Sequence, residues 1–457
     1  MTTLIPQPPG YPFFGNVFSL DKDVPALGFH RLVQEYGEIY QLNIIGRSVI
    51  FVSSHALVNE LSDDTRFSKA ISGPLKETRN LVHDGIFTAY NDEPNWNLAH
   101  RLLMPAFGAS RIKDMLEDMR EISNEIIKKW SKSTPGTKLD PTDDLTRVAL
   151  DTIALCSMSY RLNSFVSETT PPFVRAMSDC LRECNSRANR PSIVQAWVSA
   201  TNSQYHDDIR LMRDTAMDIL EKRRRNPTDK KDMLNAMLNH KRSGMSLSDE
   251  SVIDNLLTFL IAGHETTSGT MSFAIYYLLK HPQLLKKLRD EVDEVVGDQP
   301  AEVIDLNRMP FLHAVLRESM RLQPTAAIRV VNPIEDTTIG NGKYFVPKGA
   351  PIALLTWDAH RDVNVWGEDA EEFHPERMLD GKFDSLPPNA WQPFGYGMRS
   401  CIGRSFAWQE MCLVLASIVQ HFDLALADPS YELQITQAIT IKPKDFFITA
   451  RPRHVQP

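Results

Sequence analysis

The spacing of apolar residues predicts helices along most of the chain after residue 55. Positions three and four apart are apolar within each segment, which places them on one face of a helix. The predicted helices are 93–107, 113–132, 143–156, 172–184, 203–225, 231–241 and 249–280. The last one has no proline before His281-Pro282, and its about thirty residues are enough to cross a whole domain.

Short apolar-polar alternations predict a smaller β-rich part. A hairpin is expected at 38–53, turning at Ile45-Gly46, and short strands are expected within 330–357, including one over 346–357. Terminal hairpins are expected within 431–450. No internal repeat or low-complexity linker divides the chain, so we predict one mainly helical domain over residues 1–457.

Composition narrows the class of protein. Hydrophobic residues make up 42% and charged residues 24% of the 457 residues, which is typical of a soluble globular protein. The net charge of −8 gives no nucleic-acid footprint, so no nucleic-acid partner is expected. A chain of this length favours either several domains or one domain around a cofactor.

Cellular location is predicted from two features. Residues 1–16 contain no apolar run long enough for a transmembrane anchor or a signal peptide. The five cysteines form an odd set without the spacing of a disulfide framework, as expected in a reducing compartment. We therefore expect a cytoplasmic protein.

Residues 394–403 read Phe-Gly-Tyr-Gly-Met-Arg-Ser-Cys-Ile-Gly and suit a metal ligand. The apolar pattern from Ile402 predicts a helix opened by Cys401, where unpaired N–H groups favour a thiolate. A lone cysteine can also be a buried free thiol. The fixed offsets of the surrounding residues favour the metal.

The neighbours of this cysteine have expected roles of their own. Gly395 allows a sharp turn, Phe394 shields the sulfur from water, and Gly403 lets the helix lie against a flat ring. Arg399 is placed to reach a carboxylate of that ring.

This stretch resembles the haem-binding signature of the cytochrome P-450 family of haem-thiolate monooxygenases. The resemblance implies a fold in which haem lies between a long distal helix and the cysteine-loop helix. It also implies haem b as cofactor, with the Cys401 thiolate as axial ligand of an iron that activates dioxygen.

In the long helix, small residues and hydroxyls stand at 262–267, where a core helix would prefer leucine. A threonine there can simply donate to the carbonyl one turn back. The segment also resembles the distal acid–alcohol pair of the family. That resemblance assigns proton relay to Glu265 and Thr266, and leaves His264 with a structural role.

Two further segments resemble the buried Glu–Arg–Arg network of the family. Glu318 and Arg321 are three apart on one helix face, and Arg377 follows in a later segment. An exposed pair with this spacing would contribute only about 0.2–0.5 kcal/mol. The resemblance instead gives the three residues a structural role, which is to lock the loop leading to Cys401.

Trp96 and His100 are four apart and can point to the same side of a helix. Without the cysteine motif, they would be an ordinary core pair. The resemblance makes them propionate ligands of the haem together with Lys69 and Arg399. Most relatives have arginine in place of His100, and the histidine resembles the bacterial and fungal self-sufficient flavocytochromes that hydroxylate fatty acids.

That resemblance covers essentially the whole chain and implies a substrate channel. Arg47 matches a carboxylate-binding arginine, whereas Phe51 stands where a tyrosine would supply one more hydrogen bond. Phe87 is expected over the iron, and the remaining channel residues are Leu75, Leu181, Ala262, Ala326 and Ile439. Arg329 replaces an apolar residue, so it either points to solvent or marks a second polar group on the substrate.

The resulting hypothesis is a monooxygenase that hydroxylates unactivated C–H bonds near the far end of medium- or long-chain fatty acids. Its electrons come from NADPH through FMN and FAD of a diflavin reductase domain or protein outside this chain. The chain itself has no dinucleotide-binding G-x-G-x-x-G turn. The alternatives are another hydrophobic substrate, peroxide-driven chemistry, and a non-catalytic haem sensor. The retained acid–alcohol pair disfavours the peroxide-driven reaction.

Overall fold

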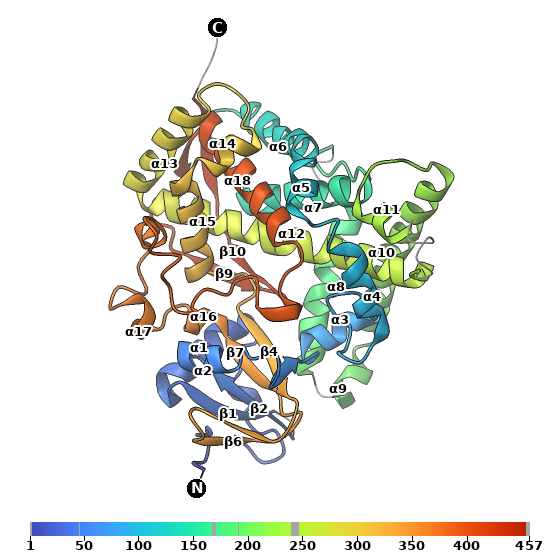
Figure 1. The fold of residues 1–457 in the computed structure, drawn as a ribbon, viewed down its shortest axis with the longest axis vertical. Helices are drawn as coiled ribbons and strands as arrows, with labels where there is room; N and C mark the ends of the chain where they lie inside the picture. The colour runs from blue at the N-terminus through green and yellow to red at the C-terminus, as the bar shows by residue number, and fades with distance from the viewer. Residues whose placement is uncertain (1, 45, 167–170, 191, 239–245, 454–457) are drawn as a thin grey trace.

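The computed structural model describes residues 2–44, 46–166, 171–190, 192–238 and 246–453. Helices form most of the molecule, and a β-rich part lies at the end that carries the N-terminus (Figure 1). This confirms the predicted mainly helical class with a smaller β-rich part. In the described part of the chain, no helix is long and apolar enough to cross a membrane.

Helix α12, Asp249–Lys280, lies across the middle of the molecule (Figure 1). The hydroxyl of Ser248 caps it by accepting a hydrogen bond from the Ser251 N–H, and two acidic residues in the first turn favour the positive helix end. Pro282 follows its end and begins α13, Pro282–Val295. Both ends agree with the sequence pattern.

The other helices surround α12. They are α1 Pro25–Tyr36, α2 His55–Glu60, α3 Pro74–Val82, α4 Pro94–Leu103, α5 Ala109–Lys113, α6 Leu116–Ser131, α7 Pro141–Met158, α8 Pro172–Asn189, α9 Ser192–Trp197, α10 Ser199–Arg225, α11 Met233–Leu238, α14 Val303–Asn307, α15 Pro310–Leu322, α16 Thr356–Ala359, α17 Val363–Trp366 and α18 Arg404–His421. Short 3₁₀ turns are η1 Val17–Ser19, η3 Pro375–Met378 and η4 Gly397–Arg399.

Some predicted helix boundaries are wrong. The helix predicted over 93–107 ends at Leu103, two residues before Pro105, which has no backbone N–H to continue it. The segment predicted as 113–132 is divided between α5 and α6. For 231–241, α11 ends at Leu238 and the remaining positions lie outside the described residues.

The main sheet has the strand order β1-β2-β7-β4-β3. Its strands are β1 Ile39–Ile44, β2 Arg47–Val52, β3 Phe67–Lys69, β4 Ile328–Pro333 and β7 Ile352–Leu355. Strand β2 pairs in parallel with β7, and the other neighbours are antiparallel. The hairpin predicted at 38–53 is therefore present as β1 and β2.

Three two-stranded sheets are also present. They are β5 Thr337–Ile339 with β6 Tyr344–Val346, β9 Gln434–Gln437 with β10 Ile441–Lys444, and β8 Phe422–Leu426 with β11 Ile448–Pro452. The strand predicted over 346–357 is wrong in extent, because a turn follows Pro347 and helix α16 begins at Thr356. Strand β8 was not predicted, since its apolar residues continue the pattern of α18.

Candidate functional site

A cavity of about 960 Å³ lies between α12, the main sheet and the loop that carries Cys401. All predicted relay, cofactor and substrate residues line it: Lys69, Trp96, His100, Phe394, Gly395, Arg399, Cys401 and Gly403; Glu265 and Thr266; and Arg47, Phe51, Leu75, Phe87, Leu181, Ala262, Ala326, Arg329 and Ile439. The fold thus brings segments from nearly the whole chain to one space.

The loop before Cys401 is closed by its own backbone. The N–H of Cys401 donates to the carbonyl of Phe394 over 2.8 Å. Gly397 has a left-handed φ of +61°, and a Cβ at this position would lie 1.9 Å from the Asp64 carboxylate. That carboxylate accepts a hydrogen bond from the Met398 N–H over 3.1 Å. A glycine is therefore required here both by its φ and by the approach of Asp64.

Cys401 is exposed, and it forms part of the cavity wall. Helix α18 begins at Arg404, so the prediction that Cys401 directly opens the helix is wrong by three residues. Burial raises the pKa of the Cys401 thiol, while the N–H of Gly403 and the charge of Arg404 oppose that rise. A metal cation at the sulfur would complete the stabilisation of the thiolate.

Cationic and aromatic side chains gather at one edge of the cavity. The Arg399 guanidinium lies 4.0 Å from the centre of the Trp96 ring, which stacks on His100 at 4.8 Å. The Lys69 ammonium donates to the carbonyl of Phe87 over 2.7 Å. Burial, together with the charge of Arg399, lowers the pKa of Lys69 to about 7. Two half-buried cations so close together in the cavity wall suit an anionic ligand.

An unused donor in this cluster supports the fit to a carboxylate of haem. Arg399 Nη2 donates to the Asn91 side chain over 3.0 Å. Arg399 Nη1 is buried and has no hydrogen-bond partner among the described residues. Because a buried donor without a partner is costly, the arrangement fits a ligand that brings its own oxygen atoms.

Glu265 and Thr266 lie on the cavity side of α12. The Thr266 hydroxyl donates to the Ala262 carbonyl one turn back, over 3.0 Å. The Glu265 carboxylate accepts from the Thr440 hydroxyl over 2.7 Å and pairs with the Lys442 ammonium at 3.0 Å. It therefore connects α12 to β10.

Burial would raise the pKa of Glu265, but Lys442, His264 and Thr440 together hold it well below its usual range. The carboxyl group is therefore ionised at neutral pH in this arrangement. Sequence reasoning missed Lys442 because it lies 177 residues from Glu265 and carries no motif of its own. Its only signal was a lysine inside an otherwise apolar strand pattern.

The predicted Glu–Arg–Arg network is a connected set of hydrogen bonds. Glu318 and Arg321 are both 0% exposed and pair at 2.7 Å. Arg377 reaches the same carboxylate at 3.3 Å and also pairs with Asp369 at 2.8 Å. The network therefore joins α15 to the segment around η3.

His360 extends this network to the cysteine loop. Its carbonyl accepts from Arg321 over 2.9 Å, and its Nε2 accepts from the Gln392 N–H over 2.9 Å. Burial and the charge of Arg321 lower the pKa of His360 to about 3. The ring is thus neutral and able to accept, but nothing in the sequence pattern indicated this contact.

The predicted substrate residues differ in their surroundings. Phe51 is 3% exposed and stacks on Tyr40 with ring centres 5.1 Å apart. Arg47 is exposed at the start of β2. The Lys69 ammonium lies 4.5 Å from the centre of the Phe87 ring, so this ring borders both the cationic cluster and the apolar space. Arg329 is half-buried and donates to Ser62 and Gln392, so the structure does not favour the alternative that it points to solvent.

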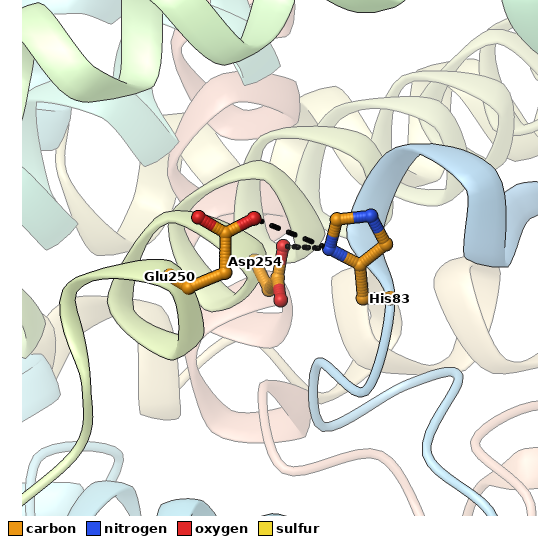
Figure 2. Close-up of side chains that lie close together, drawn as sticks. All are labelled: His83, Glu250 and Asp254. Carbon is orange, nitrogen blue, oxygen red and sulfur yellow. Dashed lines mark ion pairs between the residues drawn. The ribbon is translucent and has the colours of Figure 1, made fainter.

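A second cluster of titratable groups lies at the start of α12 (Figure 2). His83 Nδ1 is 3.2 Å from an Asp254 oxygen and 3.5 Å from a Glu250 oxygen. These three groups have ligand spacing, but Arg213 pairs with Glu250 and, at 2.8 Å, with Asp254. The guanidinium already neutralises the carboxylates, so the cluster is an ion-pair junction between α3, α10 and α12.

The chain is similar to known proteins over nearly its whole length. The model of the family Cytochrome P-450 matches residues 5–450. The chain is 55% identical to a self-sufficient cytochrome P-450 monooxygenase of Phanerodontia chrysosporium, covering 100% of this chain and 43% of that protein. It is 48% identical to a bifunctional cytochrome P-450/NADPH–P-450 reductase of Acremonium egyptiacum, covering 100% of this chain and 44% of that protein. A bifunctional protein of the same description from Aspergillus oryzae is 46% identical over 98% of this chain and 41% of its own length. The chain thus spans less than half the length of these curated relatives.

Proposed function

Because the chain belongs to the cytochrome P-450 family, we propose that it is the haem part of a monooxygenase for fatty acids. The reaction inserts one atom of dioxygen into an unactivated C–H bond near the far end of a medium or long acyl chain. The observation that carries this proposal is a single cavity with the Cys401 sulfur in its wall and Arg47 among its lining residues.

The lining residues fit haem b. Cys401 would hold the iron, and Arg399, Lys69, Trp96 and His100 would hold a propionate. When bound, the haem supplies the thiolate-ligated iron at which dioxygen is activated. The protein contributes the position of the sulfur in the cavity wall and the cationic cluster.

The rest of the cavity supports an amphiphilic substrate. Arg47 offers a cation where the substrate carboxylate would bind, and apolar side chains line the space between it and the iron site. Phe51 offers no hydroxyl, so Arg47 binds the carboxylate without help from that position. Phe87 restricts which carbon atom reaches the reactive position.

Glu265 and Thr266 manage protons in this proposal. The Thr266 hydroxyl already donates to its own helix, so its oxygen remains free to accept a hydrogen bond from water or from a bound reactant. The ionised Glu265 accepts a hydrogen bond from the Lys442 ammonium. Release from Lys442 would let the carboxyl group take up a proton and deliver it to the cavity.

Electrons come, in this proposal, from NADPH through the FMN and FAD of a diflavin reductase. The names of the relatives, which include a bifunctional cytochrome P-450/NADPH–P-450 reductase, support such a partner. The reductase is either fused to this chain or a separate protein. The experiment described below, performed on the full gene product, decides between the two.

The test combines the isolated chain, a diflavin reductase, NADPH, dioxygen and a saturated fatty acid, with mass spectrometry of the products. We expect subterminal hydroxy acids, and none from the Cys401→Ser variant. Product formation with hydrogen peroxide but none with the reductase and NADPH, or NADPH consumption that is indifferent to substrate, would contradict the proposal. A chain that binds haem yet forms no product with any electron donor would indicate a sensor.

A further inference from the structure

Two tryptophan side chains belong to a row of aromatic rings beside the loop that carries Cys401. The Phe394 ring lies 6.5 Å from the Trp408 ring and 6.1 Å from the Trp391 ring, measured between ring centres. The two indole rings are 6.5 Å apart, and Trp391 contacts Phe383 at 5.1 Å. Phe394 lines the cavity and accepts from the Cys401 N–H, whereas neither of these tryptophans is a lining residue. The row therefore begins at the cysteine loop and continues away from the cavity.

Trp408 differs from Trp391 in the group that accepts its indole N–H. Trp408 Nε1 donates to Nδ1 of His313 over 2.7 Å, whereas Trp391 Nε1 donates to the carbonyl of Arg317 over 3.0 Å. His313 Nε2 lies 3.0 Å from the carbonyl of Leu306, and a carbonyl oxygen can only accept. Nε2 therefore carries the ring proton, and Nδ1 is the accepting nitrogen. An imidazole nitrogen can also take up a proton near neutral pH, which a backbone carbonyl cannot.

The surroundings of His313 hold it in this role. The planes of the His313 and Trp408 rings are parallel within 1°. Burial lowers the pKa of His313, the hydrogen bond to Leu306 opposes this, and the charge of Arg317 adds to the lowering. The imidazole is therefore neutral at neutral pH, as a proton acceptor must be. The Cys412 sulfur lies 3.7 Å from the same Nδ1, so an indole and a thiol share one imidazole nitrogen.

This arrangement favours oxidation of Trp408 by one electron. Indole is among the side chains that lose an electron most easily, and the loss makes its N–H strongly acidic. The Arg317 guanidinium lies 5.8 Å from the centre of the Trp408 ring and disfavours a positive charge on that ring. Oxidation is therefore easiest when the N–H proton leaves together with the electron. The acceptor for that proton, His313, is already in hydrogen-bond contact.

We infer that Trp408 and His313 form a one-electron redox pair that protects the cofactor site from hydrogen peroxide. Reduction of one peroxide molecule to two water molecules consumes two electrons and two protons. Trp408 supplies the electrons one at a time to the iron site, across its contact with Phe394. Each time, the Nε1 proton passes to His313 Nδ1. The inference rests on the proposed haem site but not on the identity of the fatty acid.

A small thiol in solution completes the cycle. Trp408 is partly exposed, so the thiol can return one electron to the indole radical, and the proton returns from His313 to Nε1. Two such cycles join two thiols in one disulfide and release two protons, which replace those consumed with the peroxide. One peroxide and two thiols thus become two water molecules and one disulfide.

The experiment mixes the haem-loaded protein with hydrogen peroxide, without substrate or thiol, and records electron paramagnetic resonance of rapidly frozen samples. We expect a neutral indole radical, which has lost its nitrogen-bound proton, and we expect Trp408→Phe to lose this signal. His313→Leu should also lose the neutral radical, because the proton acceptor is gone. Trp391→Phe is the matched control, since its indole has only a carbonyl partner, and it should keep the signal. An unchanged signal in Trp408→Phe would overturn the inference.

A second measurement needs no variant. Peptide mapping of the unaltered protein after peroxide treatment should find added oxygen on Trp408, and an added small thiol should suppress this product. Added oxygen on Trp391 or on Cys412 in its place would assign the electron donor to another side chain and overturn the inference.

Haem uptake and product formation separate this inference from the proposed function. A chain that takes up no haem would contradict the proposed function. A chain that binds haem and hydroxylates fatty acids with the reductase, yet shows no indole radical and no oxidation of Trp408, would contradict only the inference.

Discussion

Replacing Arg321 with leucine should remove most of the stability of the fold around the cysteine loop. Arg321 donates to both carboxylate oxygens of Glu318, over 2.7 and 2.8 Å, and both side chains are fully buried. It also donates to the carbonyls of His360, Ala370 and Glu372 over 2.9, 2.6 and 3.0 Å. The variant leaves a buried carboxylate and three carbonyl groups without this donor.

The size of the effect follows from that geometry. Removing one partner of a buried ion pair costs about 3–5 kcal/mol because the other charge stays buried. The stability of a whole domain is only about 5–15 kcal/mol. Arg377 is 15% exposed and lies 3.3 Å from Glu318, so Arg377→Leu should cost less, about 1–2 kcal/mol. Arg161→Leu is the control, because its pair with Glu121 is about half exposed and contributes about 0–1 kcal/mol.

The assay is guanidinium unfolding of each variant, followed by the ratio of bound haem to protein after expression. The order of destabilisation should be Arg321, then Arg377, then Arg161. Haem content should fall in the same order, because Arg321 holds His360, which in turn accepts from the loop at Gln392. An Arg321→Leu protein that unfolds within about 1 kcal/mol of the unaltered one would refute the reasoning, since surface pairs reach that value.

Three further variants test the cavity itself. Thr266→Ala should keep haem and substrate binding, because the Thr266 hydroxyl donates only to its own helix, but it should divert electrons to peroxide. An unchanged amount of product per NADPH would remove Thr266 from the mechanism. Arg47→Ala should weaken binding of fatty acids about two- to fivefold, because Arg47 is exposed, but leave alcohols of equal length nearly unaffected. Equal effects on acids and alcohols by spectral titration would refute the clamp. Lys442→Met should raise the pKa of Glu265, because burial is then less opposed. The pKa of Glu265 in the unaltered protein is below that of the unfolded chain, so the ionised carboxylate stabilises the fold at neutral pH. This stabilisation is lost only as the pH falls through the lowered pKa. In the Lys442→Met variant, the amount of product formed per NADPH should therefore change with pH at values nearer neutrality than in the unaltered protein. Identical pH profiles of the two proteins would contradict this.

The sequence was most informative where one local pattern decides the structure. Helix α12 follows from a continuous apolar pattern between a capping Ser248 and Pro282. The first hairpin follows from alternation on both sides of a glycine turn. The cysteine loop was recognised because its glycines, arginine and cysteine are close together in the chain.

The sequence was least informative where the structure depends on contacts between distant segments. The start of α18 was missed because Cys401 bonds back to Phe394 and the loop continues through Gly403. Strand β8 was missed because its residues are as apolar as those of the helix before it, and only pairing with β11 makes it a strand. The burial of Arg329 likewise depends on a loop more than sixty residues later in the chain.

The pairing of Glu265 with Lys442 explains why an ionised acid can stand in the wall of a cavity with many apolar lining residues. A buried carboxyl group without a partner would be neutral, because burial raises its pKa. With Lys442 at 3.0 Å and Thr440 at 2.7 Å, it is instead charged and oriented toward β10. Lys442 also donates to Thr146 in α7 over 3.1 Å, so it can keep one partner when the carboxylate leaves. The ion pair can therefore open without leaving the ammonium unpartnered, as the proposed proton transfer by Glu265 requires.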